Sequence, residues 1–330
     1  MQYKKLVKPY NGIIDSIIKE IKKSGTIAII GHVDPDCDSI GSQLALYKTF
    51  TAEGWNADLI NEGPFDNINI GEDKKLFKKT IDIDYDLYLI VDTPAADRMG
   101  KVSNKVDFKK SIVIDHHYTN TGYCRINWVD DNFISTAEMI YLILERMNIG
   151  LDKKDVCQHL LNGVTSDNGY FKHVRIEKAF SLLVSYLLIK KGADPRISYN
   201  NMFGQKSLSS KKLLALALNR LESLAGGRIL WTYITEGDKQ GHNNAMADSA
   251  AVFNDMMSVD KTDVGIYFKV LKDKIDISFR SNDKVDVSEL AQYFGGGGHK
   301  AASGTTVKGD FENIRKEVLN KAVELLKKSN

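Results

Sequence analysis

The sequence predicts an α/β protein with an N-terminal doubly wound, mainly parallel sheet and a smaller C-terminal α/β domain with a mixed sheet. Three observations predict this fold class. Short continuous apolar runs, such as residues 27–30, alternate with helical patterns in the first half, as in parallel sheets that are buried on both faces. Beyond Gly226-Gly227 the pattern changes to neighbouring strands. The length of 330 residues allows roughly two domains with separate cores.

Composition and charge exclude several classes of protein. With 43% hydrophobic and 27% charged residues, the chain is typical of globular proteins. It has no run of about 18 apolar residues and no apolar signal-peptide core at its start, so we expect a cytoplasmic protein without membrane contacts. A formal net charge of +2 is too small for binding long nucleic acids, so a nucleic-acid ligand should be short. Three widely spaced cysteines argue against a disulfide framework.

The order of predicted elements divides the chain into a catalytic domain over residues 1–185, a helical connector over 186–222 and a substrate-binding domain over 223–330. The connector has helical periodicity with a break near residues 192–195, and it lacks the Gly/Ser repetition of a flexible linker. In the C-terminal domain the expected elements are strands at 228–235, 265–271 and 274–281, the last two joined as a hairpin, and helices at 287–294 and 311–328.

The first apolar run leads into a polar loop that carries His32, Asp36 and Asp38. Because Pro35 disfavours helix in the residue before it, we expect these side chains in the turn between strand and helix, where doubly wound sheets bind ligands. An imidazole and two carboxylates suit a divalent cation. The alternative is a solvated acidic loop in which Asp38 or Ser39 caps the following helix.

Two further apolar runs end in residues of the same kind. Residues 87–91 are followed by Asp92, and residues 111–114 are followed by Asp115-His116-His117. A single histidine or aspartate is more often a satisfied core residue or a helix cap than a metal ligand. Three strand ends that deliver acids and imidazoles to one sheet edge favour a metal site.

A fourth acidic junction follows a helical stretch near residues 153–161. Asp167 stands there between small residues, in a predicted loop. Further upstream, Ser135 and Glu138 have the spacing of a capping box before an apolar helix, and we interpret both as structural.

The order of these residues resembles the four motifs of the DHH phosphoesterase superfamily. The motifs are His32-x-x-Pro35-Asp36-x-Asp38-x-x-Gly41-Ser42, Asp92, Asp115-His116-His117 and Asp167. The Gly-rich segment 295–304 resembles the signature of the DHH-associated C-terminal domain, so the resemblance covers almost the whole chain.

Within that superfamily, the size and the Phe279-Arg280-Ser281 and Gly-Gly-Gly-His segments are most similar to the bifunctional oligoribonuclease and 3′-phosphoadenosine-5′-phosphate phosphatase branch, the nano-RNases. The sequence departs from the family's pattern at two places, and neither departure removes a predicted metal ligand. Cys37 stands where a glycine is common, and Ser166-Asp167-Asn168 replaces Thr-Asp-Thr.

The resemblance implies two metal ions per chain, bridged by Asp92. One ion is also held by His32 and Asp36, and the other by Asp38, His116 and Asp167. We expect Mn²⁺, with Mg²⁺ or Co²⁺ as alternatives. Such a pair, about 3.5 to 4 Å apart, can share a hydroxide that attacks phosphorus and can clamp the attacking and leaving oxygens. His117 is left to act on the phosphate, either by stabilising charge or by assisting the leaving group.

The resemblance also implies that the C-terminal domain holds the nucleotide across a cleft. The expected contacts are Arg280, Ser281, Gly296, Gly297, Gly298 and His299. Arg280 offers a bidentate fork to a terminal phosphate, and backbone without Cβ atoms can approach a phosphate closely. A flexible loop is the alternative for the Gly run. Arg98, beyond Asp92, either adds positive charge to the site or forms a surface ion pair.

The implied function is hydrolysis of RNA oligonucleotides of about two to five nucleotides to mononucleotides, with dephosphorylation of 3′-phosphoadenosine-5′-phosphate. Alternatives are an inorganic pyrophosphatase or exopolyphosphatase, a linear or cyclic dinucleotide phosphodiesterase, and a non-catalytic nucleotide-binding regulator. The absence of a Ser-Arg-Lys-Lys type of cluster argues against the first. The absence of membrane and sensor segments argues against a cyclic substrate. The sequence leaves the oligomeric state open, and a homodimer is compatible with it.

Overall fold

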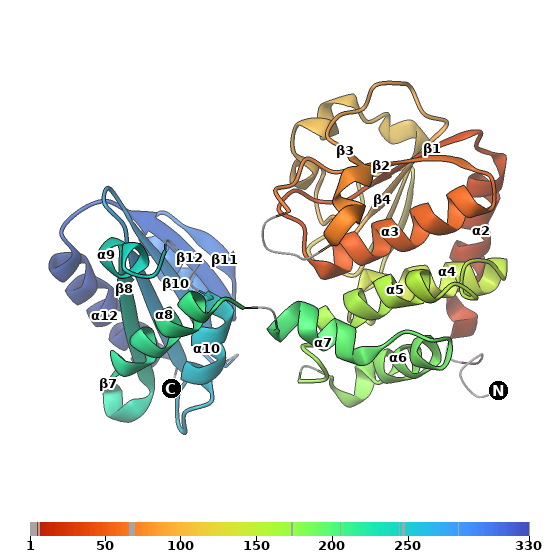
Figure 1. The fold of residues 1–330 in the computed structure, drawn as a ribbon. Coiled ribbons are helices and arrows are strands. Elements are labelled where there is room, and N and C mark those ends of the chain that lie inside the picture. Colours follow the sequence, from red (N-terminus) through yellow and green to blue (C-terminus); the bar gives the residue numbers. More distant parts are fainter. Residues whose placement is uncertain are drawn as a thin grey trace. The chain divides into compact units, whose positions relative to one another are not determined.

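The computed structural model describes residues 5, 7–65, 70–172, 174–204, 206–243, 245, 248–282 and 284–329. The chain forms two compact units, residues 1–205 and 206–330, and each is built around its own six-stranded sheet (Figure 1). The first sheet is parallel and the second is mixed, which confirms the predicted fold class. None of the helices in the described part of the chain is long and apolar enough to cross a membrane.

The N-terminal sheet has the strand order β3-β2-β1-β4-β5-β6, and all its strand pairs are parallel. The strands are β1 (Thr26–Ile30), β2 (Asn56–Ile60), β3 (Phe77–Lys78), β4 (Leu87–Val91), β5 (Ser111–Asp115) and β6 (Ile126–Val129). The order reverses between β1 and β4, and ligands bind at such a switch point in doubly wound sheets. Neither β3 nor β6 contains a continuous apolar run, so the sequence pattern does not predict these two strands.

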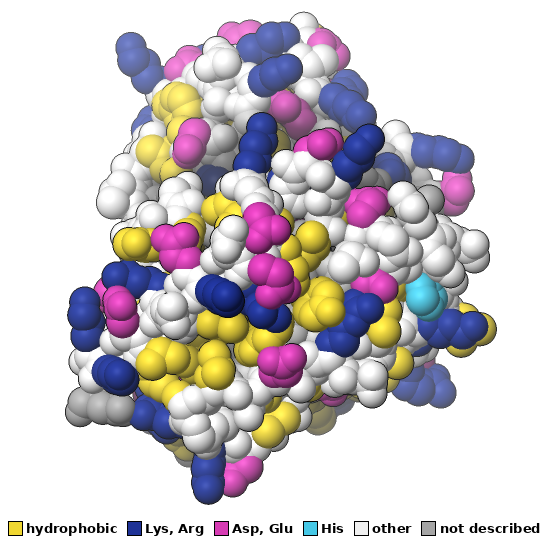
Figure 2. Space-filling view, turned by 90° about the vertical axis from the view of Figure 1, so that its left-hand side faces the viewer, with side chains coloured by type: hydrophobic (Ala, Val, Ile, Leu, Met, Phe, Trp, Pro, Cys, Tyr) yellow, Lys and Arg dark blue, Asp and Glu magenta, His cyan; other side chains and the backbone are white. Residues whose placement is uncertain are grey.

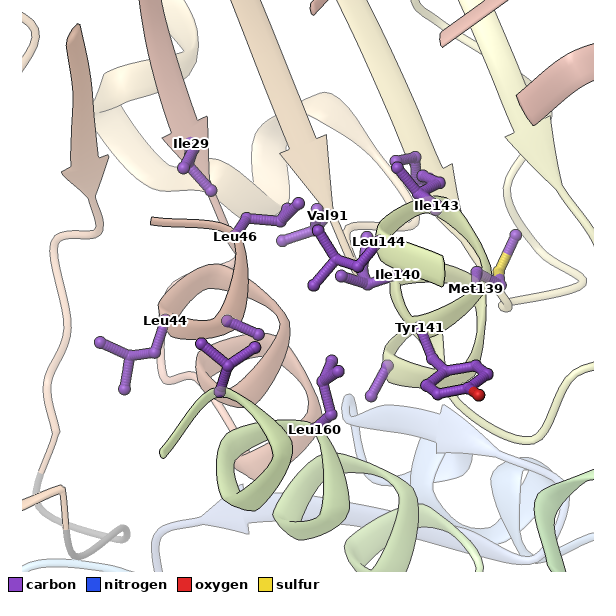
Figure 3. Packing of buried hydrophobic residues seen from close by; sticks show 14 of the residues in the cluster. Ile29, Leu44, Leu46, Val91, Met139, Ile140, Tyr141, Ile143, Leu144 and Leu160 are labelled. Atoms are coloured by element: carbon purple, nitrogen blue, oxygen red, sulfur yellow. The ribbon is translucent and has the colours of Figure 1, made fainter. Parts of the chain in front are cut away.

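Both faces of this sheet are covered, which explains the continuous apolar runs. The α-helices of the unit are α2 (Asn11–Lys23), α3 (Cys37–Ala52), α4 (Thr136–Met147), α5 (Lys154–Asp167), α6 (Phe180–Lys190) and α7 (Pro195–Phe203). The 3-10 helices are η1 (Lys8–Tyr10), η2 (Gly71–Leu76), η3 (Ala96–Lys105), η4 (Phe108–Lys110) and η5 (Ile176–Lys178). Ile29 packs with side chains of α3, α4 and α5 on one face (Figure 3). Ile30, the next residue, packs with Met99 of η3 on the other face.

Two glycines allow α3, α4 and α5 to approach closely. A Cβ atom at Gly41 would overlap the carbonyl oxygen of His159, and one at Gly163 would lie 2.8 Å from Asp38 Oδ1. Helix α5 therefore continues through Gly163 and ends at Asp167. The prediction that Asp167 lies in a loop was wrong, because the glycine provides close packing here and does not end the helix.

The two units divide inside the stretch that the sequence analysis interpreted as a connector. The predicted break between α6 and α7 is present, since α6 ends at Lys190 and Asp194 caps α7. A second break separates α7 from the first helix of the C-terminal unit, α8 (Leu208–Asn219).

The C-terminal sheet has the order β11-β12-β10-β9-β8-β7. Its strands are β7 (Glu222–Leu224), β8 (Ile229–Thr235), β9 (Val264–Val270), β10 (Ile275–Ser281), β11 (Gly297–His299) and β12 (Ala302–Val307). Its other helices are η6 (Ala225–Gly227), α9 (Glu236–Gln240), α10 (Ser249–Met257), α11 (Val287–Tyr293) and α12 (Phe311–Lys328). Strands β9 and β10 form the predicted hairpin. Helices α11 and α12 pack on one face of this sheet, and α8 and α10 pack on the other.

Part of the Gly run is a strand and not the flexible loop that was the alternative for it. Residues Gly297 to His299 form β11, which pairs with β12 at the edge of the sheet. A Cβ atom at Gly298 would lie 2.5 Å from Ser303 Cα, so glycine is what allows the two strands to approach.

Candidate metal centre

Asp92 lies at the centre of a cluster of acids and imidazoles at the carboxyl edge of the N-terminal sheet. It follows β4, its side chain is 1% exposed, and its backbone is left-handed with φ of 53°. Aspartate tolerates this conformation better than most residues, and such strain is typical of functional sites. Asp92 Oδ2 lies 3.5 Å from His32 Nε2, and Asp92 Oδ1 lies 3.5 Å from His116 Nε2.

On one side of Asp92, His32 and Asp36 complete a group whose potential ligand atoms all lie within 4.8 Å of one another. His32 Nε2 is 4.0 Å from Asp36 Oδ1. Asp36 also accepts hydrogen bonds from the backbone N–H groups of Asp38 and Ser39, each at 3.0 Å, and is thus the N-cap of α3. The suggested cap at Asp38 or Ser39 was wrong, and Asp38 lies in the first turn of the helix.

On the other side, Asp38, His116 and Asp167 form a second such group. His116 Nε2 lies 3.3 Å from Asp167 Oδ2. The buried Asp38 carboxylate accepts hydrogen bonds from the backbone N–H groups of Thr136 at 2.6 Å and Ala137 at 2.9 Å. These groups form the N-terminus of α4, whose dipole stabilises negative charge.

Thr136 is a residue of the site that the sequence analysis missed. Its hydroxyl donates to Asp92 Oδ1 at 3.1 Å, so Thr136 contacts carboxylates of both groups. The neighbouring Ser135 caps α4 as predicted, accepting from the Glu138 N–H at 3.3 Å. Glu138 departs from the capping box, because its carboxylate accepts from the Ile134 N–H.

The electrostatics of the cluster fit a bound cation. Burial, together with the charge of neighbouring aspartates, raises the pKa of both Asp38 and Asp167. Burial opposes ionisation of Asp92, but His32 and His116 lower its pKa to about 2. Among the described residues, no Lys or Arg pairs with these carboxylates. Asp92 Oδ2 is buried, and no described residue donates a hydrogen bond to it. A divalent cation would supply the missing positive charge and a partner for that oxygen.

His117 is held at the edge of the cluster by Asp115. His117 Nδ1 lies 2.7 Å from Asp115 Oδ1, and Asn120 Nδ2 donates to Asp115 Oδ2 at 2.7 Å. Burial lowers the pKa of His117, but the hydrogen bond to Asp115 outweighs it and raises the pKa above its usual value. His117 Nδ1 is also 3.7 Å from Asp92 Oδ1, so the geometry alone allows it to act as a ligand or as a charge stabiliser. Asn120, which follows three residues after the motif, gave no signal in the sequence.

The predicted substrate residue Arg98 lies in η3, and its side chain is exposed. Its carbonyl oxygen accepts from the Val33 N–H at 2.8 Å, which joins η3 to the loop after β1. No ion pair links Arg98 to a carboxylate of the described residues, so the alternative of a surface ion pair finds no partner there.

In the C-terminal unit the guanidinium of Arg280 lies 4.9 Å from the ring centroid of Phe253 and donates to the Phe279 carbonyl oxygen at 2.9 Å. No described carboxylate pairs with it, and burial lowers its pKa. Arg280 of β10 and His299 of β11 both pair with Ala302 of β12, so the two residues flank Ala302 on neighbouring strands. The side chain of His299 lies outside the described part of the structure.

Ser281, beside Arg280, has a structural contact that the sequence did not predict. Its hydroxyl donates to the carbonyl oxygen of Val285 at 2.6 Å, so it bridges the loop after β10. Of the predicted glycines, Gly297 and Gly298 lie in β11, and Gly296 precedes it.

Two family models match the chain. The DHH family N-terminal domain matches residues 26–166, and the DHHA1 domain matches residues 226–328. The chain therefore belongs to the DHH family and carries a DHHA1 domain behind its DHH domain. The fold, the acid and imidazole cluster and these matches define a phosphoesterase of this family, which is a hydrolase.

The more specific similarities are to the following proteins. The bifunctional oligoribonuclease and PAP phosphatase NrnA of Thermus thermophilus is 23% identical over 320 residues, which cover 95% of this chain and 94% of that protein. The crystal structure of an exopolyphosphatase-related protein from Bacteroides fragilis has a TM-score of 0.83 at 24% identity, covering 95% and 96% of the two chains. Exonuclease RecJ bound to manganese has a TM-score of 0.50 at 14% identity, covering 94% of each. Both structures show the shared fold.

Proposed function

We propose that this protein hydrolyses RNA oligonucleotides of about two to five nucleotides to mononucleotides and dephosphorylates 3′-phosphoadenosine-5′-phosphate. The observation that carries the proposal is the position of Asp92 between two ligand groups inside a DHH domain, because its oxygens lie 3.5 Å from His32 of one group and 3.5 Å from His116 of the other. The similarity to NrnA over nearly the whole of both chains supports the substrate class. The charge supports a short substrate, because Lys and Arg are interspersed with Asp and Glu on the face in Figure 2.

The ligand assignment follows the two groups and the position of Asp92 between them. His32, Asp36 and Asp92 would hold one ion. Asp38, His116 and Asp167 would hold the other, together with Asp92, whose Oδ1 lies 3.5 Å from His116 Nε2. Carboxylate and imidazole ligands favour Mn²⁺ among the available ions, and RecJ has been crystallised with manganese. When bound, the two ions would supply Lewis-acid activation of water and neutralise charge on the phosphate.

The chain's own residues supply the remaining functions. His117 is protonated more readily than a free histidine and is 30% exposed, so it can place positive charge or a proton next to a phosphoryl oxygen. Asp115 fixes the orientation of its ring. Arg280, which has no carboxylate partner among the described residues, would hold a terminal phosphate of the substrate.

A substrate panel tests the proposal. Di- to pentanucleotides, 3′-phosphoadenosine-5′-phosphate and pyrophosphate would be assayed with the full chain and Mn²⁺. We expect hydrolysis of the oligonucleotides and of 3′-phosphoadenosine-5′-phosphate, and none of pyrophosphate. Preference for pyrophosphate would instead favour a pyrophosphatase, and turnover of none of them with tight nucleotide binding would favour a regulator.

Replacing Arg280 by Ala should separate substrate holding from chemistry. Loss of one charged hydrogen-bonded contact is worth about 1.5 to 3 kcal/mol, so dinucleotide cleavage should fall about ten- to a hundredfold. Hydrolysis of bis(p-nitrophenyl) phosphate, which has no nucleotide to hold, should be unchanged. The His299→Ala variant should behave in the same way. Lys316→Ala, an exposed change on α12, is the control.

Equal loss on both substrates would place Arg280 and His299 in the chemistry or in the stability of the fold. No loss on either substrate would remove them from the site.

Replacing Thr136 by Val should weaken Mn²⁺ binding about 10- to 100-fold, the usual effect of losing a partner that orients a ligand. The change removes the hydroxyl that donates to Asp92 but leaves the backbone N–H that donates to Asp38. Calorimetric titration with Mn²⁺ measures the effect. Thr136→Ser, which keeps the hydroxyl, should retain most of the affinity. Equal affinities for the Val and Ser variants would exclude this role.

A further inference from the structure

A cavity lies in the N-terminal unit, outside the acid and imidazole cluster. It has a volume of about 190 Å³ and lies between α3, α5 and α7. The lining residues that matter here are Cys37, Ile40, Gln158, Asn162, Ile197 and Asn201. Pockets for drug-sized ligands start at about 300 Å³, so this cavity suits a single ring system and not a whole nucleotide.

The lining selects a neutral ligand with hydrogen-bonding edges. No Lys, Arg, Asp or Glu is among the described lining residues, so a phosphate or a charged amine would find no counter-charge in the wall. His159, which also lines the cavity, has its Nε2 atom 3.3 Å from Asp73 Oδ2. Ile40 and Ile197 supply apolar walls, and two asparagines supply amides.

The amide of Asn162 is held in a fixed orientation. Its Oδ1 accepts hydrogen bonds from Gln158 Nε2 at 2.9 Å and from the Ser198 hydroxyl at 2.8 Å. Its Nδ2 group is therefore available to donate a hydrogen bond, because no described residue accepts one from it. Apolar walls with a fixed amide at the edge are how proteins bind an unstacked nucleobase.

The cavity adjoins the proposed metal centre. Cys37 forms part of its wall and stands in the chain between Asp36 and Asp38, one from each ligand group. A base and the phosphate of its own nucleotide are separated by a single sugar. A nucleotide whose phosphate lies at the ligand groups can therefore place its base near this wall.

We propose that this cavity binds the nucleobase of a nucleotide that flanks the scissile phosphate. The inference rests on the proposed function, since it assumes a nucleotide substrate at the metal centre. It assigns base recognition to the DHH domain itself, through Asn162 on one edge of the base and aliphatic contacts on its faces.

Two variants test the cavity without touching the ligand groups. Asn162→Asp keeps an acceptor for Gln158 and Ser198 but replaces the free donor by an anionic oxygen. Ile197→Trp fills the cavity from a position that is 47% exposed, so the fold should tolerate it. Leu182→Trp, at a 45% exposed position on α6, is the matched control.

Two measurements on the full chain decide the outcome. Calorimetry with adenosine, guanosine, cytidine and uridine, without added metal, measures base binding alone. Steady-state kinetics with Mn²⁺ compares a dinucleotide with the corresponding abasic diribose phosphodiester. We expect both test variants to weaken nucleoside binding and to raise KM for the dinucleotide tenfold or more. Their kcat and their kinetics on the abasic diester should match those of the control.

These measurements distinguish failure of the base-binding proposal from failure of the proposed function. If the unmodified protein binds no nucleoside, or if the test variants bind nucleosides and cleave the dinucleotide as the control does, the cavity is not a base site. If the unmodified protein does not hydrolyse the dinucleotide, the proposed function fails, and the nucleoside titrations still decide whether the cavity binds a base.

Discussion

Replacing Asp92 by Asn is expected to abolish turnover and to remove bound metal while leaving the fold intact. The two Asp92 oxygens face His32 on one side and His116 on the other, so a neutral amide would lose the charge that both ligand groups share. Asn is preferred to Ala because the backbone φ of 53° is left-handed. Asn tolerates that conformation, whereas another L-residue costs about 1 to 2 kcal/mol there. Any change in the stability of this variant would then result only from the loss of the carboxylate.

Elemental analysis of the bound metal and thermal unfolding test this expectation. A chelator should lower the Tm of the unmodified protein, because an ion at 100 times its Kd stabilises the fold by about 2.7 kcal/mol. The Asp92→Asn variant should hold less than one ion per chain and should not respond to the chelator. Asp97→Asn, an exposed change in η3, is the control. Full metal content in the variant, or only traces of divalent metal in active unmodified protein, would refute the assignment.

Replacing His117 by Ala should leave both ions bound and lower kcat by about 10²- to 10⁴-fold, the range for a positioned acid or charge stabiliser. The expectation rests on the hydrogen bond to Asp115, which occupies His117 Nδ1 and raises the pKa of the ring. Initial rates on a dinucleotide, with metal content measured on the same sample, test it. Tyr118→Phe, a change at the exposed neighbouring residue, should have little effect.

The alternative outcome for His117 has a specific meaning. His117 Nδ1 is 3.7 Å from Asp92 Oδ1 and belongs to a third group of potential ligands with His116. Loss of an ion together with activity would show that His117 is a ligand, and its place in the assignment would change.

The sequence by itself determined the class of fold and the sheet edge at which the polar residues gather. A strand buried on both faces needs an apolar residue at every position, so β1, β4 and β5 appear as continuous runs whose ends are unmistakable. Because parallel strands end at the same edge, the residues after those runs had to be neighbours. The C-terminal hairpin and α12 could also be predicted from local patterns, the hairpin from alternation and α12 from helical periodicity.

Only the tertiary structure decided how the site is supported. Thr136 donates to a carboxylate 98 positions earlier in the chain, and no local pattern records a contact over such a distance. Asp167 ends a helix because Gly163 faces Asp38 on a neighbouring helix, although a glycine followed by small residues favours a loop locally. Residues Gly297 to His299 of the Gly run form a strand because β12 lies beside them. In each case the deciding contact joins segments that are distant in sequence, and packing outweighs local preference.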